Sequence, residues 1–113
     1  MTPEEKMHRI DALFSHVWMV RTFLKHSEEA EEDDELCEVH RELYDVMHAV
    51  GPSFAENDVG AYFKQVTKKR SKLVKAVEFF EEIQPEISGH MNFRMAARSV
   101  RTACDQILSL LDE

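Results

Sequence analysis

Glycine and proline are scarce in this sequence, with 3 of each among 113 residues. Because turns depend heavily on these residues, so few of them predict secondary-structure elements that are few and long. The β-branched residues are scattered and do not gather into the short alternating runs that are typical of strands. Hydrophobic residues nevertheless make up 43% of the chain, which is enough for a real core. We therefore expect an all-α fold in a single domain, residues 1–113.

Cysteines and long apolar runs are also few. The two cysteines, Cys37 and Cys104, form no Cys-x-x-Cys motif and no metal-ligand spacing. No stretch approaches the roughly 18 uninterrupted apolar residues of a membrane-spanning helix. The first residues carry no apolar core of a signal peptide. We therefore expect a cytoplasmic protein with reduced thiols and no membrane partner.

Positive charge is in deficit, because the formal net charge is −8. Phosphate contacts need a cationic surface, so nucleic acid is not an expected partner. The imbalance is uneven along the chain: residues 1–58 hold 5 Lys or Arg and 15 Asp or Glu, whereas residues 59–113 hold 9 and 7. This asymmetry has two interpretations. The two halves attract each other in the folded chain, or a basic face on the second half meets an acidic partner.

Four segments are separated by chain-breaking residues. The strong breakers are Gly51-Pro52, Gln84-Pro85 and Ser88-Gly89, and a softer boundary lies in residues 25–35, which are almost entirely polar. Thr2 and Pro3 are suited to the start of a first helix, and Ser88 is expected to cap the last one. The predicted helices cover approximately residues 3–26, 33–50, 55–83 and 90–112.

Apolar residues recur at helical spacing in every segment, which predicts one buried stripe on each helix. In the first segment the expected stripe consists of Ile10, Leu13, Val17, Val20 and Leu24. Short connections between four amphipathic helices favour an antiparallel up-down-up-down four-helix bundle, as a monomer or a dimer. An alternative remains, because nothing between Glu4 and Val50 forces a break. If the first two segments fuse into one long helix, two chains must intertwine to bury their stripes.

The first helix has an apolar arc that is wider than one stripe, and this arc suggests an interaction surface. The extra residues are Phe14, Trp18, Met19 and Phe23. A row of basic residues at helical spacing in the last segment is a second candidate surface, which could bind an acidic partner. The row consists of Arg94, Arg98 and Arg101. The first functional hypothesis is therefore a protein-interaction or oligomerisation module that binds a protein partner or a second copy as a homodimer.

A polar layer of His and Arg inside the bundle is the basis of the second hypothesis, in which the protein is a ligand-binding, metal-binding or catalytic bundle. Arg70 occupies a stripe position between Val66 and Leu73, and His16 and His40 lie at a similar height if the first two helices form a hairpin. Tyr44 would lie at the edge of this layer. Three outcomes are open for a buried Arg70: it reaches the rim and meets Glu38 or Glu42, it joins a buried hydrogen-bond network, or it holds an anion or small polar ligand.

Metal and catalytic motifs are lacking. The chain has no His-Glu-x-x-His motif, and Glu35 and Glu38 are followed three residues later by Glu38 and Arg41, where the Glu-x-x-His pairs of di-iron bundles have His. His8 and His16 are eight residues apart, as are His40 and His48, which means about 80° of rotation and about 12 Å of rise along a helix. One helix cannot chelate a single ion with such a pair. We expect no metal and no cofactor, assign no catalytic residue, and favour a protein that is not an enzyme.

Overall fold

The computed structural model describes residues 1–113, which form five helices and no strands. The helices are α1 (Pro3–Lys25), α2 (Glu28–Glu32), α3 (Asp34–Ala55), α4 (Val59–Ile87) and α5 (Met91–Leu111). The prediction of an all-α fold is confirmed. None of the helices has a run of apolar residues long enough to cross a membrane.

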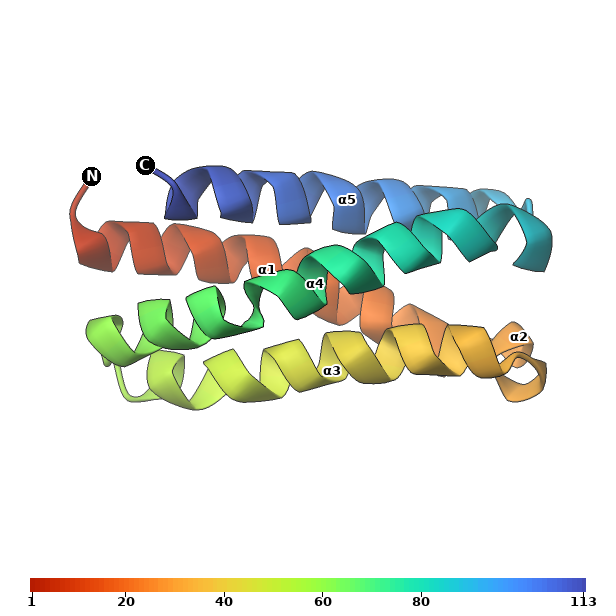
Figure 1. The fold of residues 1–113 in the computed structure, drawn as a ribbon, viewed down its shortest axis with the longest axis horizontal. Helices are drawn as coiled ribbons and strands as arrows, with labels where there is room; N and C mark the ends of the chain where they lie inside the picture. The colour runs from red at the N-terminus through yellow and green to blue at the C-terminus, as the bar shows by residue number, and fades with distance from the viewer.

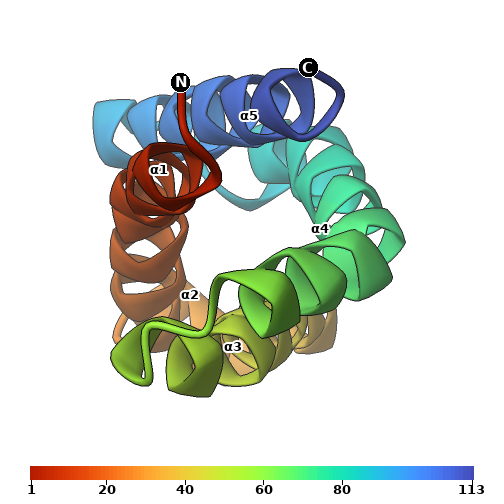
Figure 2. The ribbon, with the colours of Figure 1, turned by 90° about the vertical axis from the view of Figure 1, so that its left-hand side faces the viewer.

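The four long helices lie along the longest axis of a molecule that measures 42 × 22 × 19 Å (Figure 1). Figure 2 shows them end-on around a single core, with α1 and α4 at opposite corners. Helix α1 packs against α3 and α5, and α4 packs against the same two helices. Both chain termini lie at one end of the molecule. Helix α1 therefore has two flanks, one shared with α3 and the other with α5.

Side-chain caps separate α1 from α3. The Ser27 hydroxyl accepts a hydrogen bond from the Ala30 amide (3.2 Å) and starts the short helix α2. The Asp33 carboxylate then accepts from the Leu36 amide (2.9 Å) and starts α3. Such caps satisfy amides that have no partner within the helix. The alternative of one long helix through both segments is therefore wrong, because α1 ends at Lys25 and two further helices, α2 and α3, begin after it.

Two expected helix ends, at Val50 and Ile83, are displaced. Helix α3 continues through Pro52 to Ala55, and α4 continues through Pro85 to Ile87. A proline removes one helical hydrogen bond and crowds the preceding turn. Beyond its proline, α3 runs three more residues and α4 two more, and these residues include Phe54 and Ile87, which pack against the core. Tertiary packing thus outweighs the local preference of proline.

The connections on either side of α4 also differ from expectation. Asn57 adopts φ 54° after the end of α3, a left-handed conformation that Asn tolerates better than most residues. Asp58, and no earlier residue, then caps α4. At the other end Ser88 closes α4, and His90 caps α5 by accepting from the Asn92 amide (3.0 Å). The expected cap at Ser88 is therefore wrong by two residues.

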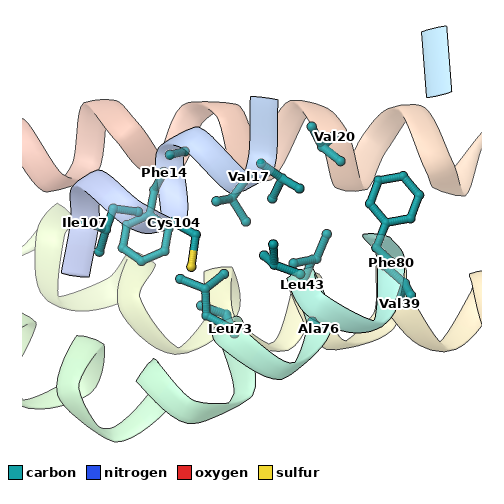
Figure 3. Close-up of a cluster of buried hydrophobic side chains, with 14 of the residues drawn as sticks. Phe14, Val17, Val20, Val39, Leu43, Leu73, Ala76, Phe80, Cys104 and Ile107 are labelled. Atoms are coloured by element: carbon teal, nitrogen blue, oxygen red, sulfur yellow. The ribbon is translucent and has the colours of Figure 1, made fainter. Parts of the chain in front are cut away.

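One apolar cluster of 26 buried residues, drawn from all five helices, forms the core. Its central part is drawn in Figure 3, where side chains of the four long helices meet. Leu43, Val66 and Ile107 are buried, as their stripe positions predict. A polar contact crosses the core between opposite corners: the buried Tyr62 hydroxyl donates to the Asp11 carboxylate (3.1 Å). Burial raises the pKa of both groups.

Ion pairs on the surface join neighbouring helices. Lys69 and Lys72 of α4 both reach the Asp45 carboxylate of α3, at 2.9 and 2.7 Å. Hydrogen bonds from these two ammonium groups lower the pKa of Asp45 to about 2. Because the folded-state pKa is depressed below 3.8, the stabilisation is present above that pH and is lost as pH falls towards 2.

Replacing Asp45 should therefore have a pH-dependent cost. We expect Asp45→Asn to lower the free energy of unfolding by about 1 kcal/mol near pH 7, the upper range for a solvent-exposed ion pair. The difference from the unmodified protein should narrow between about pH 4 and about pH 2, because the native carboxylate then becomes protonated. Urea unfolding followed by circular dichroism across this pH range measures the difference in free energy of unfolding. Glu38→Gln, which removes an unpaired carboxylate from α3, is the control; a similar pH-dependent loss there would contradict the assignment.

Candidate functional site

The polar layer expected at the centre of the molecule does not form. His16 is exposed, with Nδ1 3.2 Å from the Ser99 hydroxyl of α5. Arg70 reaches the rim and makes two hydrogen bonds to the Asp112 carboxylate (2.7 and 2.8 Å), so the expected partners Glu38 and Glu42 are wrong. His40 is only partly buried, on α3. The structure therefore keeps these three side chains apart.

The geometry of α4 explains why the Arg70 side chain points away from the buried stripe of this helix. Lys69 turns towards Asp45 on α3, and Arg70 turns the other way towards Asp112 on α5. The core at this height is filled by apolar side chains, including Leu73 and the buried Cys104 (Figure 3). Burial raises the pKa of the Cys104 thiol to about 11, so this side chain acts as an apolar core group.

The residues expected to form one interaction surface are divided between several places. Phe14 is only 1% exposed and belongs to the core, so its assignment to a contact surface is wrong. Trp18 lies beside Tyr44 on the α3 flank of α1, whereas Phe23 packs against Phe93 of α5. Met19, at 62% exposure, is available for contact.

The basic row of α5 is also divided. Arg101 is engaged by Glu81 of α4, whose carboxylate lies 3.0 Å from the Arg101 Nε, and by Asp105 at 3.1 Å. Arg94 and Arg98 are exposed and form none of the ion pairs in the structure. Only these two arginines of the row remain free to meet a partner.

The α5 flank of α1 carries a surface that we call the methionine face: Met19, Phe23, Met95, His16 and Arg98. Two adjoining hollows of about 300 and 340 Å³ lie along it, and Met95 and Ser99 line both. Met95 is 52% exposed. No acidic side chain lines either hollow. The face is therefore apolar along its floor and basic at its edge.

The α3 flank of α1 carries a different arrangement, centred on Arg21. This side chain is only 9% exposed, and its Cζ atom lies 4.8 Å from the centre of the Trp18 ring and 4.7 Å from the centre of the Tyr44 ring. Its buried Nε–H has no acceptor, and no ion pair in the structure involves it. Trp18 and Tyr44 remain 39% and 42% exposed. We call these three residues the Arg21 site.

Positive charge gathers beside the Arg21 site. His40 has its pKa lowered, first by burial and then by the charges of Arg21, Arg41 and Lys25. These three are among only 5 basic residues in the acidic half of the chain, residues 1–58. Lys25 and Arg41 are exposed and form no ion pair. The acidic half thus contains a local cationic surface that the overall charge conceals.

Arg21 was missed in the sequence, although a signal for it exists. The residues buried along α1 include a run with alternating three- and four-residue steps: Met7, Ile10, Phe14, Val17, Arg21 and Leu24. Leu13, which belonged to the expected stripe, is only partly buried. An arginine that continues an unbroken core spacing is thus the feature that could have found this site.

A further hollow, of about 650 Å³, lies between α3 and α4. Its charged lining residues are of both signs: Glu38, Glu42, Lys68, Lys72 and Lys75. Lys72 is 3.5 Å from Glu42 and 2.7 Å from Asp45, so part of this charge is already neutralised within the chain. The lysines of this hollow therefore have acidic neighbours within the chain, unlike the arginines on the two flanks of α1.

No group of three or more His, Cys, Asp or Glu side chains is arranged to hold a metal ion. Comparisons with protein-family models, with curated proteins and with solved structures find no match to this chain. The functional assignment therefore depends on the two flanks of α1.

Proposed function

We propose that this protein is a protein-interaction module, built as an antiparallel up-down-up-down four-helix bundle, that binds an amphipathic helix of a partner protein on its methionine face. The short connections between helices and the termini at one end support this topology. We place the protein in the cytoplasm, where its two free cysteines would remain thiols.

The exposed apolar floor between α1 and α5 is the observation that carries the proposal. Methionine side chains are flexible and polarisable, and they serve binding surfaces that adapt to a partner. Here Met19 and Met95 are both more than half exposed beside continuous hollows. The lining residues run from Asn92 to Gln106 on α5, a length of about 21 Å that would accommodate about four turns of helix.

The charge of the face indicates which kind of helix it would accept. The positive charge of Arg98 lies along it, with no acidic lining residue to neutralise it. A partner helix with an apolar stripe and flanking carboxylates is complementary to this pattern. A symmetric contact between two copies would instead place like charges of the same face together. These considerations favour a partner protein over a homodimer.

Photocrosslinking in cells tests the proposal directly. Benzoylphenylalanine placed at position 95 should give a discrete product with one partner protein, whereas the same group at position 64 of α4, diagonally opposite α1 (Figure 2), should not. The same partner captured from both positions would contradict a specific face. A covalent dimer of the chain as the only product would identify a second copy as the occupant and overturn the assignment to a partner protein.

Variants of the methionine face supply the quantitative test. We expect the double variant Met19→Asp/Met95→Asp to weaken the purified complex at least about tenfold, because a contact centre typically contains residues worth 1–2 kcal/mol or more. Both positions are exposed, so the free energy of unfolding should change by no more than about 0.5 kcal/mol per substitution. Isothermal titration calorimetry measures the affinity, with Lys64→Asp as the matched control. Unchanged affinity in the double variant would refute the assignment.

A further inference from the structure

The Arg21 site is a second feature of the surface, on the opposite flank of α1 from the methionine face. The Arg21 residue as a whole is nine-tenths buried without an anionic partner, and within its guanidinium the Nε–H is a buried donor that lacks any acceptor. Withdrawing part of a charged group from water without a counter-charge is unfavourable. The cation–π contacts with the two rings offset this cost only in part. The arrangement is therefore unfavourable by itself and would gain from an oxyanion.

The surroundings of Arg21 are suited to more than one negative group. The charges of Lys25 and Arg41 act on His40 together with that of Arg21, so several cations lie near this histidine. Both side chains are exposed and unpaired, and they can turn towards a ligand. A ligand with several adjacent carboxylates would therefore match this surface better than a single small anion.

We propose that the Arg21 site binds an acidic peptide segment of a partner protein. One carboxylate would accept hydrogen bonds from the guanidinium of Arg21, whose planar fork matches the two carboxylate oxygens. Neighbouring carboxylates would pair with Lys25 and Arg41. The rings of Trp18 and Tyr44 would limit water around the central contact, and a hydrogen bond to a charged group is stronger where water is excluded.

The charge distribution favours a short segment over a long polyanion. The run Glu28–Glu35, with seven carboxylates, follows Lys25 along the chain and would repel an extended nucleic acid. Charges beyond about 8 Å are largely screened at physiological ionic strength. A short acidic peptide can therefore contact the cationic surface despite the net charge of −8.

Fluorescence provides a local readout, because Trp18 is the only tryptophan in the chain. Capped hexaglutamate is the probe, and capped hexaglutamine of the same length is its neutral match. We expect hexaglutamate to change the Trp18 emission in a saturable way and hexaglutamine to leave it unchanged. Equal responses to the two peptides would overturn the proposal, as would an equal response to acetate at the same carboxylate concentration.

Variants then assign the effect to the site. Arg21→Met should weaken hexaglutamate binding at least tenfold, because it removes the charge-assisted hydrogen bonds to the carboxylate, which are stronger than neutral ones. Arg21→Lys keeps the charge but loses the fork and should give an intermediate affinity. Arg9→Met removes an exposed arginine from the same helix and should leave the affinity unchanged. An equal loss in Arg9→Met would show a general charge effect and overturn the proposal.

Two further measurements separate this proposal from related ones. Met19→Asp/Met95→Asp, which disables the methionine face, should leave hexaglutamate binding intact. The proposals for the methionine face and for the Arg21 site can therefore be refuted independently. Sedimentation equilibrium of the unmodified protein should show no dimer that depends on Arg21. Such a dimer would mean that the acidic segment of a second copy occupies the site, which would overturn the assignment to a different partner.

Discussion

Phe14→Ala is expected to lower the free energy of unfolding by about 3–5 kcal/mol, the usual cost of removing a large aromatic ring from a packed core. Phe14 is 1% exposed and belongs to the cluster in Figure 3. The loss combines the transfer free energy of the ring with the cavity that remains, because neighbouring helices relax only in part. A loss of this size would be a large fraction of the total stability of a small domain.

Urea unfolding followed by circular dichroism measures this change, and Met19→Ala is the matched control. Met19 lies on the same helix but is 62% exposed, so its truncation should change stability by no more than about 0.5 kcal/mol. If Phe14→Ala instead impaired partner binding while its stability stayed normal, the assignment of Phe14 to the core would be wrong.

The contrast between Phe14 and Met19 shows what helical spacing can predict. The spacing predicted helices and a buried side for each, and Leu43 and Ile107 lie in the core accordingly. Spacing could not predict which side chains of the wide apolar arc of α1 are buried and which are exposed, because large side chains occur at adjoining positions there. The choice between core and surface there depends on where α3 and α5 pack against α1, and that arrangement is a property of the whole fold.

Helix ends were harder to predict than helices for a related reason. Pro52 and Pro85 are strong local breakers, yet α3 and α4 each continue past them. What extends these helices is the packing of Phe54 and Ile87 against the core. Local sequence preference is visible in a single chain, whereas a contact with a distant helix is not.

The candidate site shows the same limit for charged residues. Arg21 and Arg70 both occupy positions that continue a core stripe, so their spacing predicts burial for both side chains. Arg70 escapes because Asp112, 42 residues later in the chain, lies within 2.7 Å of its guanidinium. Arg21 has no such partner and packs against two rings. Which arginine stays buried is thus decided by acids that only folding brings near.

Arg21→Met is expected to raise the free energy of unfolding by about 1–3 kcal/mol, because a hydrophobic residue of similar length avoids the cost of a buried charge. Methionine keeps contact with Trp18 and Tyr44 while it removes the unpaired Nε–H. The variant also loses two cation–π contacts, worth about 0.5–2 kcal/mol each, and this loss reduces the gain in stability.

The stability of Arg21→Met is best followed by circular dichroism, since substitution beside Trp18 would itself change the fluorescence. Arg9→Met is the control, and we expect it to change stability by no more than about 0.5 kcal/mol. A destabilised Arg21→Met would mean that the guanidinium is already favourably solvated in the free protein, and the energetic basis of the acidic-peptide site would be lost. A stabilised variant that no longer binds hexaglutamate would instead show a residue kept for binding at the expense of stability, as functional sites often require.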